Sequence, residues 1–115
     1  MSAKTDFDYL RDMLTYAEDG HAMVENRSEG DLDSDDALRY GVQYCILIIG
    51  EAASHVSDAT RCKMPQVPWQ EIVGMRNWLV HGYVRINSKI VWETATLNLP
   101  RLIDEILQFL PPEHT

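Results

Sequence analysis

Apolar side chains recur at three- and four-residue steps along most of the chain, which is the spacing of amphipathic helices. The first such segment covers about residues 6–25, and its inward positions are Leu10, Met13, Leu14, Ala17, His21 and Val24. The stretch from Asn26 to Asp31 is polar, contains a glycine and is typical of a loop. Ser34 or Asp33 is expected to cap the next helix, because either side chain can accept a hydrogen bond from a free backbone N–H group.

The second helical segment, about residues 35–57, has apolar side chains on more than one side. Such a helix is predicted to be buried on most sides, either at the centre of a bundle or at a dimer interface. Gly50, Ala52 and Ala53 are small enough to let another helix come close. Glu51 stands among them, and an acid in such surroundings needs a partner.

Prolines delimit the third helix. Residues 57–67 are polar and contain Pro65, so we expect a connection without continuous helix there. Pro68 can open a helix, since its missing N–H group costs nothing in a first turn. The apolar positions then continue up to His81, and Gly82 is a natural helix stop.

The last third predicts a divided helix. Asn87 or Ser88 is expected to cap its start, and Pro100 to kink or divide it. Asn98 can cap the final segment, which ends before Pro111. The whole pattern, residues 1–115, predicts one all-α domain that is an antiparallel bundle of four or five helices.

Composition fits this fold and narrows the setting. The chain has 115 residues, 45% hydrophobic and 24% charged, as in ordinary soluble globular domains. Cys45 and Cys62 have the spacing of neither a disulfide framework nor a metal site. The polar amino terminus differs from a signal peptide, and the longest apolar run, 45–49, is too short to span a bilayer. We therefore expect a cytoplasmic protein without contact with membranes.

Charge is distributed unevenly. The net charge of −8 argues against indiscriminate binding of nucleic acid, because such affinity comes from Lys and Arg neutralising phosphates. Residues 1–60 carry a net charge of −9 and residues 90–115 of −3, whereas residues 61–89 carry +4. A phosphate-bearing partner is therefore expected to be small or narrowly presented, such as a tRNA end or an exposed strand.

The positive segment contains the most reactive group of side chains, between Met75 and Tyr83. Arg76 offers a permanent cation with a planar fork of donors that suits phosphate. His81 can exchange protons near neutral pH. Tyr83 adds an aromatic ring and a hydroxyl. A cation, a proton shuttle and a stacking ring are what a metal-free ribonuclease needs, so neither a metal nor a cofactor is expected.

Spacing complicates a joint site for Arg76 and His81. Five residues apart on an ideal helix, they would point about 140 degrees from one another, with a rise of roughly 7.5 Å. Either the helix loosens at His81, or two chains pair so that each site is completed across a two-fold axis. Each residue could also have a purely structural role. Arg76 could pair with Glu71 or Asp104 on the surface, and His81 could simply stabilise the end of a helix.

The remaining histidines and tryptophans have ordinary interpretations. His21 and His55 are expected to be packed or capping residues rather than ligands, and a zinc site from His55, Cys45 and Cys62 lacks any recognised spacing. The three tryptophans are expected in the core or an interface, although one near Arg76 could stack on a base.

The segment from Arg76 to Tyr83 resembles the Arg-four residues-His-any-Tyr signature of the HEPN superfamily, in particular its HepT branch. The similarity extends in the same order to Ile49–Ala53, to Val67–Asn77 and to Ile90–Thr94, and so covers nearly the whole chain. The resemblance implies an α-helical homodimer and a metal-independent RNase that is the toxin of a type II toxin–antitoxin system.

The resemblance also implies roles for particular residues. Arg76 and His81 would be catalytic, and Asn77 and Tyr83 would contact the RNA substrate. The antitoxin would be a minimal nucleotidyltransferase of the MntA type, which neutralises the toxin by adding AMP to Tyr83. Glu51 matches an acid of the family and is a possible supporting residue.

Two further functions compete with the ribonuclease. The chain could be a noncatalytic helical partner of a nucleotidyltransferase, which its overall acidity favours. It could also be a purely structural dimer, in which Arg76 and His81 would be dispersed over the surface.

Overall fold

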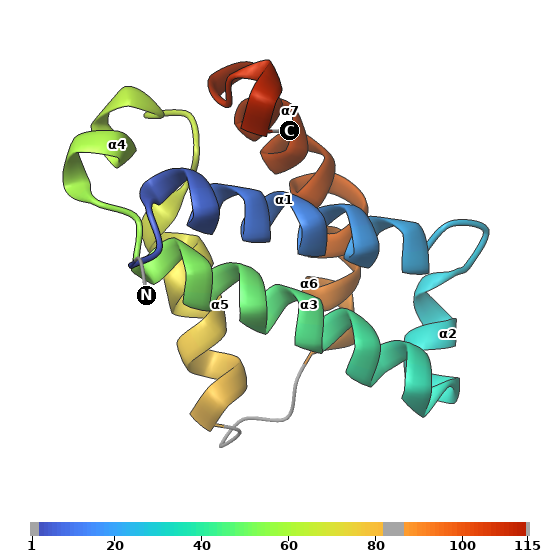
Figure 1. Cartoon of the computed structure of the whole chain (residues 1–115). Helices are drawn as coiled ribbons and strands as arrows, with labels where there is room; N and C mark the ends of the chain where they lie inside the picture. The colour runs from blue at the N-terminus through green and yellow to red at the C-terminus, as the bar shows by residue number, and fades with distance from the viewer. Residues whose placement is uncertain (1–2, 82–86, 115) are drawn as a thin grey trace.

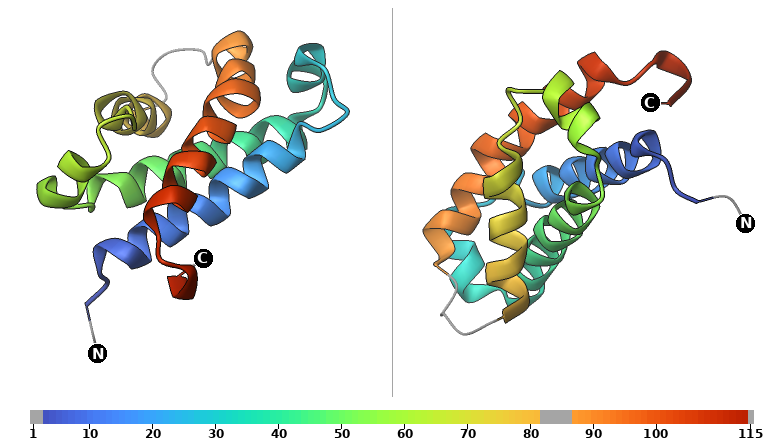
Figure 2. Two further views of the ribbon diagram at one scale, coloured as in Figure 1. Left: turned by 90° about the horizontal axis from the view of Figure 1, so that it is seen from above. Right: turned by 90° about the vertical axis from the view of Figure 1, so that its left-hand side faces the viewer.

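The computed structural model describes residues 3–81 and 87–114, and every regular element within these ranges is helical (Figure 1). The two longest helices, α1 (Asp6–Met23) and α3 (Asp36–Ser54), pack side by side and run antiparallel (Figure 1). α5 (Trp69–His81) packs on α3 but crosses it instead of running alongside (Figure 2). The prediction of an all-α fold is confirmed for the described residues, and the antiparallel arrangement holds for α1 and α3.

α3 forms the middle of the structure, as its apolar sequence predicts. One side packs on α1 and another on α5, so residues spread around the helix are buried. These buried residues are Leu38, Val42, Cys45, Ile46, Ile49, Gly50, Ala52 and Ala53. The expected N-cap is wrong by one or two residues. Asp35, and not Asp33 or Ser34, accepts a hydrogen bond from the backbone N–H of Leu38 at 3.1 Å.

Two short helices lie where the sequence predicts loop or connection. α2 (Glu29–Ser34) overlaps the expected loop at residues 26–31, and α4 (Asp58–Lys63) lies in the expected polar connection. Each begins after a serine. The Ser57 side chain accepts from the backbone N–H of Thr60 at 3.3 Å, and the backbone N–H of Ser28 donates to the Asp31 side chain at 2.8 Å. These helices carry few apolar residues and have no periodicity to reveal them, which is why the pattern missed them.

The last third is divided as Pro100 predicts. α6 (Ser88–Glu93) is capped by Asn87, whose side chain accepts from the Lys89 N–H at 2.9 Å. A π-helical turn, η1 (Thr94–Asn98), separates α6 from α7 (Leu99–Phe109). Asn98 lies at the expected cap position, but its side chain makes no capping hydrogen bond.

The helices enclose a continuous hydrophobic core. Its largest fully buried side chains are Leu10, Met13, Leu32, Val42, Val91 and Ile106, which come from α1, α2, α3, α6 and α7. Cys45 is buried, Cys62 is exposed, and both are free thiols. None of the helices described is both long and apolar enough to cross a membrane.

Candidate active site

A glycine lets α5 approach α3 at the position of Arg76. A Cβ atom added to Gly50 would clash with the Cβ of Arg76 and lie 2.9 Å from the carbonyl oxygen of Ile72. The two helices therefore touch through main-chain atoms here, as the small residues of α3 predict. This contact fixes where the stem of Arg76 leaves α5.

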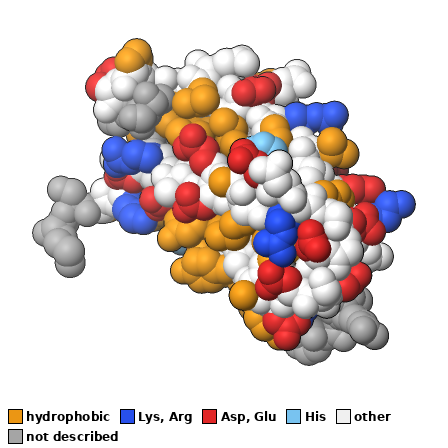
Figure 3. Space-filling view, turned by 90° about the vertical axis from the view of Figure 1, so that its right-hand side faces the viewer, with side chains coloured by type: hydrophobic (Ala, Val, Ile, Leu, Met, Phe, Trp, Pro, Cys, Tyr) orange, Lys and Arg blue, Asp and Glu red, His pale blue; other side chains and the backbone are white. Residues whose placement is uncertain are grey.

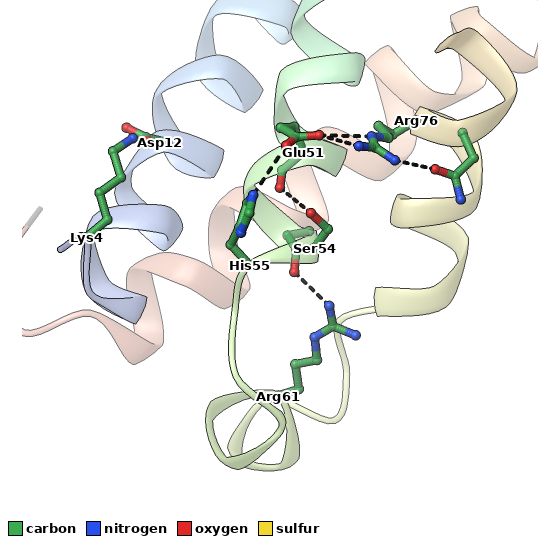
Figure 4. Close-up of polar contacts among 9 residues, drawn as sticks. Lys4, Asp12, Glu51, Ser54, His55, Arg61 and Arg76 are labelled. Atoms are coloured by element: carbon green, nitrogen blue, oxygen red, sulfur yellow. Dashed lines mark hydrogen bonds and ion pairs between the residues drawn. The ribbon is translucent and has the colours of Figure 1, made fainter. Parts of the chain in front are cut away.

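Glu51, the next residue of α3, binds the guanidinium group of Arg76 (Figure 4). Its Oε2 atom accepts from Nε of Arg76 at 3.0 Å and from Nη2 at 2.5 Å. The pair keeps the pKa of Glu51 below its usual range, first because of the hydrogen bond from Arg76 and then because of one from His55. Glu51 thus has a partner, as the sequence predicts, although its side chain is 44% exposed, and Glu71 and Asp104 are not the partners of Arg76.

A second neighbour orients the far side of the guanidinium. Nη1 of Arg76 donates to the Oδ1 atom of Asn77 at 2.5 Å. Because the oxygen of this amide accepts from Arg76, its NH2 group points elsewhere and can donate to a ligand. Asn77 is exposed. Arg76 and Asn77 thus form a joint set of donors.

The pairing leaves part of Arg76 available. A guanidinium has five N–H groups. Contacts within residues 3–81 and 87–114 use three of them, on Nε, Nη2 and Nη1. The two that remain, one on each terminal nitrogen, can donate to an anion such as phosphate. The side chain is 30% exposed, so solvent and ligands can reach it.

His81 is exposed and is the last residue of α5. The α-helix includes His81, so a helix that loosens at His81, one of the two arrangements that could join the site, is not seen. On a regular helix His81 lies about 20 degrees from Gly74 and about 40 degrees from Asn77, on the open side of α5. Arg76 instead lies on the side of buried Trp69. One chain therefore groups Arg76, Asn77 and Glu51, whereas His81 points about 140 degrees away from Arg76 on a regular helix, on the side that carries Asn77.

Tyr83 lies outside the described residues. The other histidines have the ordinary roles expected of them. The half-buried His21 lies 3.1 Å, through Nδ1, from the carbonyl oxygen of Ala95, and His55 is the C-cap of α3. The contact of His55 with Glu51 is not among the predictions from the sequence, although their four-residue spacing on one helix is a signal for it. Among the residues described, no group of three or more His, Cys, Asp or Glu could hold a metal ion.

A groove of about 600 Å³ lies between α5 and the segment from α6 to α7, over α3. Its wall is mainly apolar and includes Ile46, Ile49, Met75, Ile90 and Leu102. Arg76 and His81 do not line this groove. The candidate site is therefore an open surface around Arg76, and the groove is a separate feature of the same side of α3.

Comparison with known proteins places the chain in a family. A sequence profile described as "Ribonuclease HepT-like" matches residues 13–109. The chain belongs to this HepT-like family. The matched range includes Glu51, Arg76, Asn77, His81 and Tyr83, so the resemblance noted in the sequence is confirmed.

Curated relatives of this HepT-like chain carry ribonuclease names. "Putative RNase TTE0752" of Caldanaerobacter subterraneus subsp. tengcongensis is 34% identical over 110 residues, which cover 96% of this chain and 98% of the relative. "Putative RNase MJ1216" of Methanocaldococcus jannaschii is 33% identical over 97 residues, 84% of this chain and 80% of the relative. "Probable ribonuclease HepT" of Thermococcus cleftensis is 27% identical over 95 residues, 83% and 86% of the two chains. No solved structure matches the chain significantly.

Proposed function

We propose that this HepT-like chain is a metal-independent ribonuclease in which Arg76 binds the scissile phosphate and His81 transfers a proton. The observation that carries the proposal is the way Arg76 is held. Glu51 binds Nε and Nη2 of its guanidinium, Asn77 binds Nη1, and these contacts among the described residues leave two N–H groups for an anion. A preorganised cation of this kind stabilises charge that grows on phosphoryl oxygens in a transition state. Membership of a ribonuclease family supports the same class of enzyme.

The proposed reaction is attack of a ribose 2′-oxygen on the adjacent phosphorus. A bond forms between the 2′-oxygen and phosphorus, and the bond from phosphorus to the 5′-oxygen of the next nucleotide breaks. His81 removes the proton of the 2′-hydroxyl as general base or gives a proton to the leaving 5′-oxygen as general acid. The products are a 2′,3′-cyclic phosphate and a 5′-hydroxyl. Asn77 donates to a phosphate oxygen beside Arg76, and Tyr83 contacts the RNA.

We further propose that the active form is a homodimer that joins Arg76 of one copy with His81 of the other. A regular α5 holds the two side chains on different sides of one chain, and a two-fold axis can bring them together. Val80, next to His81, is 54% exposed and Ile90 is 43% exposed, so apolar surface beside the motif is open to a second copy.

Mixing inactive subunits tests the shared site. Arg76→Ala and His81→Ala proteins should each be inactive, and a mixture allowed to exchange subunits should regain about a quarter of the wild-type activity, because half the dimers then hold one complete site of two. Sedimentation should give a mass of roughly 26 kDa for a chain of 13.2 kDa. A dimer whose mixed variants stay inactive would instead place both groups of each site in one chain.

The charge of the surface limits how RNA can bind. On the face shown in Figure 3, acidic side chains alternate with a few basic ones and with apolar patches, and the visible described residues form no continuous basic track. Together with the net charge of −8, this favours contact with one phosphate and its neighbours over contact with a long duplex.

The decisive experiment uses an RNA oligonucleotide with one 2′-deoxy position, incubated with purified protein in EDTA. We expect cleavage at ribose positions, none at the deoxy position, and cyclic phosphate ends. His81→Ala should lower the rate by roughly 10²–10⁴-fold and Arg76→Ala by roughly 10²–10³-fold. Arg11→Ala, which removes an exposed cation paired with Asp8, is the matched control and should cleave normally. RNA that stays intact with the wild-type protein would contradict the proposal.

For the biological role, we propose the toxin of a toxin–antitoxin pair whose antitoxin is a minimal nucleotidyltransferase that adds AMP to Tyr83. Support comes from the family signature. AMP on Tyr83 would put a bulky anion near Arg76 and compensate its charge. The chain should slow bacterial growth when expressed alone, and mass spectrometry after coexpression with a neighbouring nucleotidyltransferase should find AMP on Tyr83. Equal growth of wild type and His81→Ala, with a stable complex of the two proteins, would favour the noncatalytic partner.

A further inference from the structure

We propose that His55 is a positioning residue for Arg76 and that it acts through the carboxylate of Glu51. The catalytic consequence of this role rests on the proposed ribonuclease function, whereas the positioning itself does not. The structural basis is a chain of contacts from α1 to α5. Tyr9 stacks on His55, His55 binds Glu51, and Glu51 binds Arg76. Figure 4 shows His55, Glu51 and Arg76.

His55 is itself held in place from two sides. Its backbone N–H caps α3 by donating to the carbonyl of Ala52 at 3.0 Å. Its ring stacks on Tyr9 of α1, with 5.0 Å between the ring centroids and 17° between the planes. The ammonium of Lys4 lies 5.4 Å from the centroid of the Tyr9 ring. The stacking on Tyr9 therefore favours the orientation in which the imidazole faces Glu51, in a side chain that is 51% exposed.

The contact between His55 and Glu51 assigns a proton. Nε2 of His55 lies 3.3 Å from Oε1 of Glu51. An ionised carboxylate only accepts hydrogen bonds, so Nε2 must carry the hydrogen. The lowered pKa of Glu51 agrees with an ionised carboxylate here. His55 thus donates to one carboxylate oxygen while Arg76 donates twice to the other.

This division of the carboxylate sets where Glu51 holds the guanidinium of Arg76. With Oε1 bound by His55, Glu51 presents Oε2 alone to the Nε and Nη2 groups of the guanidinium. Without His55, the carboxylate is able to rotate and to place both oxygens on the guanidinium, which is the usual bidentate arrangement. The guanidinium would then shift relative to Glu51, and its remaining N–H groups would move with it. His55 also donates toward the negative charge of Glu51, which otherwise reduces the attraction of Arg76 for an anion.

An NMR experiment tests the positioning without any enzymatic reaction. The Nε–H resonance of Arg76, assigned by its loss in Arg76→Lys, reports the hydrogen bond to Glu51. We expect His55→Ala to shift and broaden this resonance, and His55→Gln, which keeps an N–H donor, to restore it at least in part. Glu51→Gln should change it more than either. An unchanged resonance in folded His55→Ala protein would overturn the proposal.

Kinetics then test the catalytic consequence. If the wild-type protein cleaves RNA, His55→Ala should lower kcat by about 10-fold, with a smaller effect on KM, because a misplaced Arg76 loses more transition-state than ground-state binding. His55→Gln should recover most of the loss. A wild-type protein that shows the NMR pattern but no cleavage would refute the ribonuclease and leave the positioning intact. Equal loss of kcat in the Ala and Gln proteins would argue against the donor role of His55.

Discussion

Two glycines of the α3–α5 region should respond in opposite ways to the same substitution. Gly50→Ala adds a methyl group against Arg76 and the Ile72 carbonyl, so it should lower the free energy of unfolding by about 1–3 kcal/mol and disturb the Glu51–Arg76 pair. Gly74→Ala adds a methyl group that, apart from its own stretch of helix, has no atom of the described residues within 4 Å, and should raise stability by up to about 1 kcal/mol. Urea unfolding of the two proteins measures both effects. A stable Gly50→Ala protein would mean that α5 can move away from α3 at little cost.

At the scale of single residues, the sequence indicates which side chains require a partner better than it indicates which residue that partner is. Glu51 was expected to require a partner because an acid among small and apolar residues is costly alone. The identity of that partner depends on where α5 crosses α3, and nothing local in the sequence reports a crossing point. Residue types alone make Glu71 and Asp104 possible partners of Arg76. The contact of Tyr9 with His55 is equally nonlocal.

At the scale of elements, the two asparagines that begin α6 and α7 should differ. Asn87 caps α6 through its side chain, whereas Asn98 makes no capping hydrogen bond. Asn87→Ala should therefore cost about 1 kcal/mol and lower Tm by several degrees, while Asn98→Ala should change Tm little. Thermal unfolding followed by circular dichroism compares them directly. Equal shifts in Tm for the two variants would show that the capping hydrogen bond of Asn87 does not cause its loss of stability.

The π-helical turn gives His21 a structural task. Pro100 has no N–H to offer the carbonyls of the preceding turn, and Leu99 bonds back five residues to Thr94. The carbonyl of Ala95 instead accepts from Nδ1 of His21 on α1, at 3.1 Å. An atom left without its partner in this half-buried place costs roughly 1–3 kcal/mol.

This task predicts the behaviour of His21 variants. His21→Ala should destabilise the fold by about that amount, and His21→Gln, which keeps an N–H donor, should recover part of the loss. Chemical unfolding of the three proteins is the measurement. If both variants lose the same stability, the contribution of His21 comes from packing of the ring and not from the hydrogen bond to Ala95.

The elements themselves were predicted unevenly. Long amphipathic helices and proline boundaries were found, because periodicity and missing N–H groups act locally. α2 and α4 were missed, since a helix of six residues is too short to show a period and its capping serine is equally common in loops. The π-helical turn could be anticipated only as an interruption at Pro100. Its hydrogen-bond partner, His21, lies 74 residues away.

At the scale of the whole molecule, stability should fall in acid. The pKa values of Asp6, Asp8, Asp31, Asp35 and Glu51 all lie below their usual ranges, owing to hydrogen bonds and ion pairs in the folded chain. A carboxyl group with a lowered pKa stabilises the fold above its pKa in the unfolded chain, about 4. That contribution is lost as the pH falls through the lower folded value. Tm should therefore be nearly constant from about pH 7 to 5 and fall steeply toward pH 2.

Asp6 is the carboxyl group through which to test this prediction. It accepts from the hydroxyl of Ser57 at 2.5 Å and from that of Thr60 at 2.6 Å, and so ties the start of α1 to the start of α4. Asp6→Asn should lower Tm by a few degrees, about 2–6, near neutral pH and reduce the difference in Tm between pH 7 and pH 3. Thermal scans across this pH range measure both quantities. An unchanged difference would mean that other carboxyl groups cause the acid loss.

The main-chain contact at Gly50 determines which positions of α5 can change without moving the helix. The position of α5 on α3 depends on main-chain atoms at this crossing. Substitutions at outward positions of α5, such as Gln70 and Gly74, therefore leave that position unchanged. New residues there could alter which ligands reach the neighbourhood of Arg76 while the arginine keeps its place. Libraries that vary these two positions and retain Gly50 are therefore a suitable starting point for engineering altered selectivity in this chain.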